Sequence, residues 1–308
     1  MCSAFWRTLP STAPCSDRAD GKGKALTFTT LHPVCSVDGN IIAAHDTGPV
    51  ETRRVPLLCL PGLTRTARDF ETLAGQAEAL GRRVVAIDFR GRGASDRTAP
   101  ESYTPAREAD DVLAVQTALG LGPCILVGTS RGGIVAMVIA VQRPGAIAGS
   151  VLNDIGPAID MRGLLRLRSS IGTRRPPEDF ADAVRLVKAG LAHQFPAFDE
   201  DDWLAYAKAT FAFENGKPVS DCDPAVLSGL SALSSKIPTI PLYGPFKALA
   251  KRPMLVLRGE HSDILSQESL AFAETVGAAT YTVEGQGHAP VLGGAVLDRM
   301  AAFLSPLN

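Results

Sequence analysis

The stretch that most constrains the fold of this chain runs from Pro123 to Gly133 and reads Pro-Cys-Ile-Leu-Val-Gly-Thr-Ser-Arg-Gly-Gly. A short apolar run ends at Gly128, and a helical pattern starts just after Ser130. The spacing Gly128-x-Ser130-x-Gly132 therefore predicts a strand, a tight turn and a helix, with a serine at the apex. Glycines are needed on both sides because the turn brings neighbouring backbone too close for a Cβ atom. Such a turn lifts the Ser130 hydroxyl above the sheet edge and makes it a candidate nucleophile.

Apolar runs typical of buried strands alternate with helical patterns around this turn. A hairpin is expected near residues 26–45, because Asp38-Gly39 between two β-like runs favours a tight turn. Strands at this spacing indicate an α/β fold with a mostly parallel central sheet and helices on both faces. The expected buried strands, besides the one before Ser130, lie at 55–60, 84–88, 150–154, 253–257 and 280–283.

The pattern changes in two places. Residues 1–24 lack any hydrophobic period and are predicted to be a disordered extension or the result of a misplaced start codon. From 155 to 240 the rhythm becomes one of helices alone, which predicts a helical insertion. The core is therefore expected to consist of residues 25–154 and 241–308.

Aromatic side chains are concentrated in and just after this insertion. Nine of the eighteen in the chain lie between 155 and 250. They either line an apolar substrate pocket, for which Trp203 and Phe213 are the candidates, or simply pack the helices together.

Composition excludes several classes of partner. Lys plus Arg (31) nearly cancels Asp plus Glu (32), so no field exists to hold nucleic acid or an anionic membrane surface. No apolar run reaches the roughly 18 residues of a membrane span. The six cysteines form no C-x-x-C pair, which favours reduced thiols, a cytoplasmic setting and no structural zinc.

Gly91-Arg92-Gly93 resembles half of a dinucleotide fingerprint, but Asp96 replaces the third glycine, so no cofactor is expected.

A serine hydroxyl attacks only if a base removes its proton and a third group orients that base. His288 follows an expected strand directly, in a glycine-rich loop, and Asp263 follows the preceding strand. Along the chain, the order Ser130, Asp263, His288 is the one expected when the nucleophilic serine lies on a turn between a strand and a helix. Asp154 also ends a strand near the elbow and is the alternative acid.

From about Leu26 to the end, the sequence resembles the α/β-hydrolase superfamily, in its lid-bearing branch of esterases and meta-cleavage-product hydrolases. The resemblance implies that Ser130 is the nucleophile, His288 the base, and Asp263 the orienting acid. It also implies that the backbone N–H groups of Leu63 and Arg131 form the oxyanion hole, and that residues 155–240 are a lid. The motifs that carry it are Leu60-Pro61-Gly62-Leu63, Asp88-Phe89-Arg90-Gly91-Arg92-Gly93-Ala94-Ser95-Asp96, Gly128-Thr129-Ser130-Arg131-Gly132-Gly133, Arg258-Gly259-Glu260-His261-Ser262-Asp263 and Gly287-His288.

Two positions depart from the pattern of that superfamily. Pro61-Gly62 stands where His-Gly is usual, although a backbone amide donor should survive this change. Ala289 stands where the carbon–carbon hydrolases typically carry Trp, which weakens that activity as an alternative. The sequence thus predicts a serine hydrolase that cleaves a small carboxylic ester or lactone through an acyl-enzyme, without metal or organic cofactor. The alternatives are a C–C bond hydrolase of a vinylogous diketone and a small-molecule receptor with little turnover.

Overall fold

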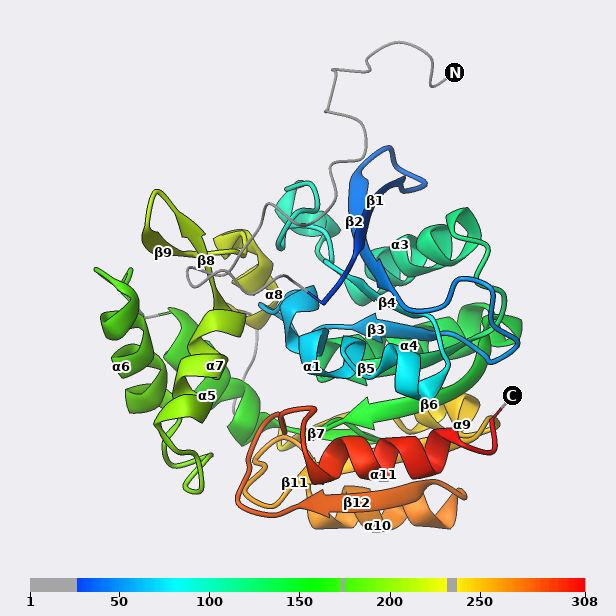
Figure 1. The fold of residues 1–308 in the computed structure, drawn as a ribbon. Coiled ribbons are helices and arrows are strands. Elements are labelled where there is room, and N and C mark those ends of the chain that lie inside the picture. The colour runs from blue at the N-terminus through cyan, green and yellow to red at the C-terminus, as the bar shows by residue number, and fades with distance from the viewer. Residues whose placement is uncertain (1–26, 173–174, 232–236, 308) are drawn as a thin grey trace.

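An eight-stranded sheet forms the centre of the protein in the computed structural model, which describes residues 27–172, 175–231 and 237–307 (Figure 1). The predicted extension, 1–24, lies outside the described residues. The strands follow the order β1-β2-β4-β3-β5-β6-β11-β12. Only the β1–β2 and β2–β4 pairs are antiparallel, so the predicted mostly parallel sheet is confirmed. The strands are β1 (Thr30–Cys35), β2 (Ile41–Thr47), β3 (Leu57–Leu60), β4 (Val84–Ile87), β5 (Cys124–Thr129), β6 (Ile147–Asn153), β11 (Met254–Gly259) and β12 (Ala279–Val283).

The inner strands are short and apolar because both of their faces are covered. Every residue of β3, β4 and β5 is buried, as expected for continuous apolar runs in a parallel sheet. The predicted hairpin is also confirmed, since β1 and β2 pair across a turn in which Gly39 has φ 87°. A positive φ of this size is adopted by glycine without steric cost.

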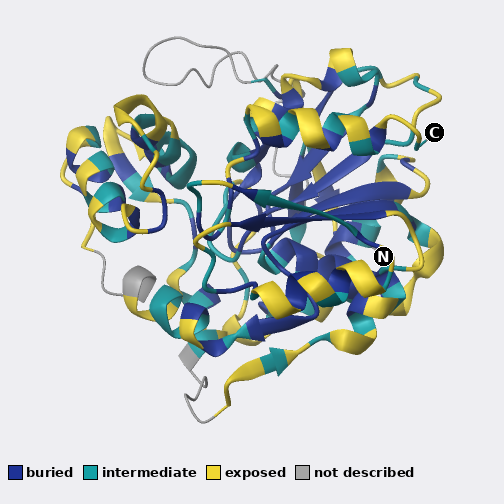
Figure 2. Cartoon of the chain, turned by 90° about the horizontal axis from the view of Figure 1, so that it is seen from below, coloured by how far each residue is buried: buried dark blue, intermediate teal, exposed yellow. Residues whose placement is uncertain are grey.

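Helices pack on both faces of the sheet, and Figure 2 shows the buried strands between them. One apolar cluster joins one face to α3, α4, α9 and α10, and a second joins the other face to α1, α2 and α11. Helix α3 begins at Pro105 after Thr104, whose hydroxyl accepts a hydrogen bond from the Arg107 amide. The helices are α1 (Glu71–Ala74), α2 (Ala77–Leu80), α3 (Pro105–Ala118), α4 (Arg131–Gln142), α9 (Tyr243–Leu249), α10 (Gln267–Thr275) and α11 (Ala295–Leu304).

The insertion follows β6 in the chain and lies at the carboxyl ends of the sheet strands (Figure 1). It is predicted to contain helices alone, but it also contains strands. Its two ends pair as antiparallel strands, β7 (Ala158–Asp160) with β10 (Thr239–Pro241). A hairpin of β8 (Phe211–Glu214) and β9 (Lys217–Ser220) turns at Asn215-Gly216, where both residues have positive φ. Asn-Gly is the strongest short hairpin signal, so the sequence did contain the evidence. The helices of the insertion are α5 (Met161–Gly172), α6 (Phe180–Leu191), α7 (Glu200–Thr210) and α8 (Ser228–Ser231).

Short 3₁₀ turns connect several of these elements. In the described ranges, no helix is both long enough and apolar enough to cross a membrane. The cytoplasmic setting stays a prediction. The 3₁₀ turns are η2 (Ala67–Phe70), η3 (Pro100–Ser102), η4 (Pro144–Ala146) and η5 (Pro224–Leu227).

We expect Gly132→Ala to destabilise the fold, because helix α4 approaches β3 through this glycine. A Cβ at position 132 would lie 2.6 Å from the carbonyl carbon of Leu60 and even closer to its oxygen. Neither atom belongs to a flexible side chain, so the free energy of unfolding should fall by about 1–3 kcal/mol, as in overpacked cores. Gly145→Ala is the control, since nothing lies within 4 Å of its added Cβ. Equal urea midpoints for the two variants would contradict the close packing.

Candidate active site

Ser130 stands at the turn between β5 and α4 in a conformation that few non-glycine residues adopt. Its backbone has φ 49° and ψ −107°. A residue held this way carries strain on the order of 1–3 kcal/mol and persists only where its surroundings enforce it. The enforcement is the close packing of the turn, because a Cβ on Gly128 would lie 2.6 Å from the amide nitrogen of Gly133. The predicted strand, turn and helix are therefore present.

His288 lies in the loop after β12 and directs its imidazole at Ser130. The distance from Nε2 of His288 to the Ser130 hydroxyl oxygen is 2.9 Å. The imidazole is buried, and the His288 backbone N–H donates a hydrogen bond of 3.0 Å to the side-chain oxygen of Gln194. Both the ring and the loop that carries it are thus held in place.

Asp154, the residue after β6, completes a chain of three side chains. Its Oδ2 lies 2.7 Å from Nδ1 of His288. The Asp154 carboxylate has no exposed surface, and it accepts two more hydrogen bonds, from the Gly259 amide (2.9 Å) and the Ser262 hydroxyl (2.5 Å). A carboxylate only accepts, so the proton on His288 sits on Nδ1 and Nε2 is left to accept from Ser130. This is the tautomer that a general base requires.

The expectation that Asp263 lies against His288 is wrong. Asp263 instead forms an ion pair with Arg166 of α5, with 2.8 Å between Oδ1 and Nη2. The Arg166 guanidinium takes up the Asp263 carboxylate, and the end of β11 and the loop after it instead hold Asp154 through the Gly259 amide and the Ser262 hydroxyl. The alternative acid, Asp154, occupies the position beside the histidine.

The two amides expected to face a developing oxyanion lie at the ends of neighbouring strands. Leu63 follows β3, and Arg131 is the first residue of α4 after β5. Within the ranges that the structure describes, neither backbone N–H has a hydrogen-bond acceptor. For Arg131 this is the ordinary state of a first helical amide, which leaves the donor free for a ligand.

The sequence profile of the Alpha/beta hydrolase family matches residues 57–303, which include Ser130, Asp154 and His288. The chain belongs to the alpha/beta hydrolase family. The resemblance inferred from the motifs is therefore confirmed, and the sheet order and elbow described above are those of an alpha/beta hydrolase.

Several relatives of this alpha/beta hydrolase are named as hydrolases or lipases. The chain is 28% identical over 268 residues to the 3-hydroxybutyrate-oligomer hydrolase of Cupriavidus necator, covering 81% of this chain and 87% of that protein. It is 33% identical over 144 residues to the sn-1-specific diacylglycerol lipase ABHD11 of Mus musculus, covering 46% of this chain and 43% of that protein. An alpha/beta hydrolase from Novosphingobium aromaticivorans is 35% identical, with a TM-score of 0.81 and coverage of 89% and 98%.

Of the two pocket residues expected in the insertion, Trp203 lies in its interior and Phe213 lies on its surface. Trp203 is only 1% exposed and packs inside the insertion, edge-on to Phe195 and Phe198. Phe213, on the exposed β8–β9 hairpin, is 47% exposed and touches Phe180. The burial of Trp203 favours the second explanation of the aromatic residues, in which they pack the helices of the insertion together and do not line a pocket.

Other nucleophiles and metal ligands contribute little to this alpha/beta hydrolase site. Burial raises the pKa of the Cys124 thiol to about 12 and that of Cys222 to about 11, so both stay protonated and unreactive at neutral pH. Among the described residues, no group of three His, Cys, Asp or Glu side chains is placed to hold a metal ion.

Gln194, which follows α6, is the contributor that the sequence did not reveal. It is 5% exposed and reaches out of the insertion to accept the His288 N–H. A Cβ on Gly287 would lie 2.7 Å from Cδ and 2.8 Å from Cβ of Gln194. Gly287, the residue before the histidine, was the one sequence feature that could have indicated this contact. Glycine is often required where another part of the protein approaches the backbone closely.

We expect Gly287→Ala to lower activity more than stability, because the added methyl must displace Gln194 and with it the loop that holds His288. A displacement of about 1 Å at a reacting group costs on the order of 10²-fold in rate. Gly293→Ala, in the same segment, is the control, since its Cβ would meet only Val291 at 3.9 Å. Initial rates on p-nitrophenyl acetate, with melting temperatures, measure both effects. Equal rates for the two variants would show that Gln194 does not fix the loop.

Proposed function

We propose that the protein is a serine hydrolase that cleaves a carboxylic ester or lactone through an acyl-enzyme. The observation that carries this proposal is the unbroken chain of contacts from Ser130 through His288 to Asp154, with 2.9 Å and 2.7 Å between the paired atoms. A nucleophile, a base within hydrogen-bond reach and a buried carboxylate behind the base are the parts that acyl transfer needs. The family assignment supports a hydrolase in general.

In the first half of the reaction, Ser130 attacks the ester carbonyl as Nε2 of His288 takes its proton. The resulting imidazolium is stabilised by the Asp154 carboxylate, which is held by Gly259 and Ser262 and so needs no reorganisation. The amides of Leu63 and Arg131 then donate hydrogen bonds to the negatively charged former carbonyl oxygen. Because neither amide has an acceptor of its own within the described residues, both can donate.

In the second half, His288 returns its proton to the leaving alcohol, and the C–O bond to that alcohol breaks. Water then enters, loses a proton to Nε2 and attacks the acyl carbon. Collapse of the second tetrahedral intermediate transfers that proton to the Ser130 oxygen and releases the acid. Each carboxylic ester or lactone thus consumes one water, and every residue ends in its starting state.

The insertion serves in this proposal as a lid over the site. Two contacts support this role, one on each side of Ser130. Gln194 bonds the backbone of His288, and Arg68, in the turn after the Leu63 loop, pairs with Asp221 of the insertion at 2.7 Å. The name of the Cupriavidus necator relative points to oligomers of a short hydroxy acid, so 3-hydroxybutyrate oligomers belong beside simple esters in the first substrate panel.

We expect Ser130→Ala to abolish covalent labelling by a fluorophosphonate and to lower ester turnover by about 10³-fold or more, because the nucleophile is lost. Gel fluorescence and rates on p-nitrophenyl butyrate measure the two effects, and a circular dichroism spectrum checks the fold. Wild-type protein that takes no label at Ser130, or that shows no steady turnover on any ester or lactone, would overturn the proposed function.

The acid is tested by a pair of isosteric changes. Asp154→Asn keeps the shape but cannot stabilise the imidazolium, so kcat near neutral pH should fall by about 10⁴. Asp263→Asn only weakens a partly exposed ion pair with Arg166, and activity should stay within about threefold of the wild type. Loss of activity in Asp263→Asn, with Asp154→Asn nearly normal, would contradict the contacts described above.

A further inference from the structure

A glutamate with no exposed surface lies between two arginines, one of which is the residue that follows Ser130. Glu108 projects from the first turn of α3. Its Oε2 accepts a hydrogen bond of 2.6 Å from Nε of Arg131, and its Oε1 lies 3.0 Å from Nη1 of Arg92. The Arg92 side chain is fully buried and that of Arg131 is 15% exposed. Removing a carboxylate from water costs free energy unless cations pair with it. A fully buried glutamate is therefore uncommon, and its position suggests a specific role.

Each arginine is tied to one of the two amides assigned to the oxyanion hole. Arg131 itself provides one of them, and its Nη2 is fixed further by the carbonyl of Tyr103, at 3.0 Å. Arg92 donates from Nε to the carbonyl oxygen of Leu63 at 2.8 Å. Leu63 supplies the other amide. Glu108 is therefore the point at which the supports of both amides meet.

The charges of the cluster also favour an anion nearby. Arg92 and Arg131 carry two positive charges and Glu108 one negative charge, which leaves a net charge of +1 in a dry environment. Electrostatic interactions act more strongly there than in water. Burial lowers the pKa of Arg92, and the Glu108 carboxylate opposes this and keeps the guanidinium charged.

We propose that Glu108 is a positioning residue that sets the spacing and direction of the Leu63 and Arg131 amides and so stabilises the oxyanion of the transition state. This inference rests on the proposed function. Glu108 touches neither substrate nor Ser130 in this scheme and acts only through the two arginines. Its loss should therefore alter the transition state and leave the binding of the uncharged ester nearly unchanged.

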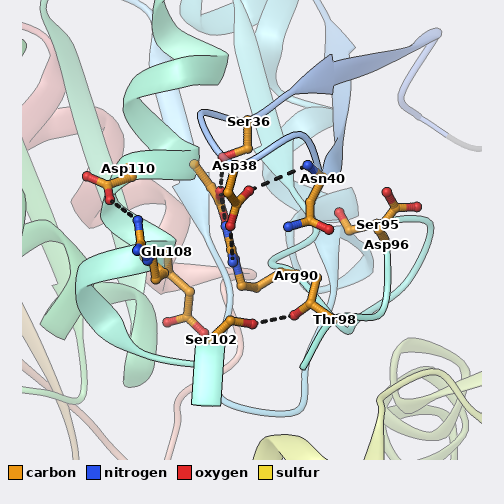
Figure 3. A network of polar contacts seen from close by, with 12 residues as sticks. Ser36, Asp38, Asn40, Arg90, Ser95, Asp96, Thr98, Ser102, Glu108 and Asp110 are labelled. Carbon is orange, nitrogen blue, oxygen red and sulfur yellow. Dashed lines mark hydrogen bonds and ion pairs between the residues drawn. The ribbon is translucent and has the colours of Figure 1, made fainter. Parts of the chain in front are cut away.

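The same helix offers a matched control one turn further on. Asp111 is also fully buried, and its Oδ1 and Oδ2 pair with Nη2 and Nε of Arg90, each at 2.7 Å. Arg90 also pairs through Nη1 with Asp38 in the β1–β2 hairpin, at 2.9 Å, and Figure 3 shows these two side chains together. Asp111 thus belongs to a buried ion pair of the same kind and, within the described part of the chain, bonds to neither of the two residues that supply the amides. It is linked to the cluster through the backbone of Arg90, whose carbonyl oxygen accepts a hydrogen bond of 2.6 Å from Nη1 of Arg92.

The deciding experiment compares Glu108→Gln with Asp111→Asn. Glutamine accepts with one oxygen only, so its NH₂ group would face one of the two arginines and disrupt that contact. Removing one oxyanion donor costs about 10²–10³-fold in kcat, and a misplaced donor should cost about 10–100-fold. We expect this loss in kcat for Glu108→Gln, with KM changed by less than about twofold. The affinity for an alkylboronic acid, whose tetrahedral adduct on serine resembles the transition state, should fall by a similar factor.

Asp111→Asn should lower the melting temperature but leave kcat and boronate affinity within about twofold of the wild type. The proposal is overturned if Glu108→Gln behaves in the same way, while Ser130→Ala still abolishes labelling and the wild type still turns over esters. In that outcome the proposed function stands alone. Wild-type protein without Ser130 labelling or ester turnover removes both proposals together.

Arg92→Lys keeps the proposal testable if Glu108→Gln does not fold. Lysine retains the positive charge beside Glu108, but its single ammonium group cannot hold both Glu108 and the Leu63 carbonyl in the geometry of the guanidinium fork. We expect a fall in kcat and in boronate affinity of about tenfold, with KM nearly unchanged. Unchanged kcat and boronate affinity in a folded Arg92→Lys protein would overturn the role of the cluster.

Discussion

The strained turn at Ser130 is the constraint on which the rest of the site depends. A serine with φ 49° is held there only because β3, β5 and α4 approach so closely that Gly128 and Gly132 admit no side chain. That approach brings the end of β3, with Leu63, beside the start of α4, with Arg131. The same backbone packing therefore positions the hydroxyl of the proposed nucleophile and the two amides of the proposed oxyanion hole, and the strain is the cost of holding this hydroxyl clear of the sheet.

Much of this arrangement could be predicted because the signals are local. Glycine spacing specifies the elbow, and apolar runs specify the buried strands. The carboxylate beside His288 could not be assigned in this way, because Asp154 and Asp263 both follow strands and the sequence does not say which of them pairs with an arginine of the insertion. The donors that hold Asp154, Gly259 and Ser262, come from the segment that also carries Asp263. Only their contacts in three dimensions separate the two carboxylates, since Asp154 meets His288 and Asp263 meets that arginine.

The insertion was harder to predict than the core for a related reason. Its aromatic residues fit either a pocket or a packed interior, and composition alone does not distinguish these. The packing of Trp203 against Phe195 and Phe198 shows that the insertion has a small core of its own. It meets the sheet domain through apolar packing, such as that of Cys222 and Val226 with Tyr103. It also meets that domain through polar contacts, such as that of Gln194 with His288.

Placing the acid after β6 changes what the loop after β11 can do. Asp263 stands where the sequence order expected the acid, yet its carboxylate is occupied by Arg166 of α5. Both side chains are partly exposed, so the pair adds little to global stability. The carboxylate that does not lie behind His288 thus connects the insertion, through α5, to the loop whose Ser262 hydroxyl holds Asp154.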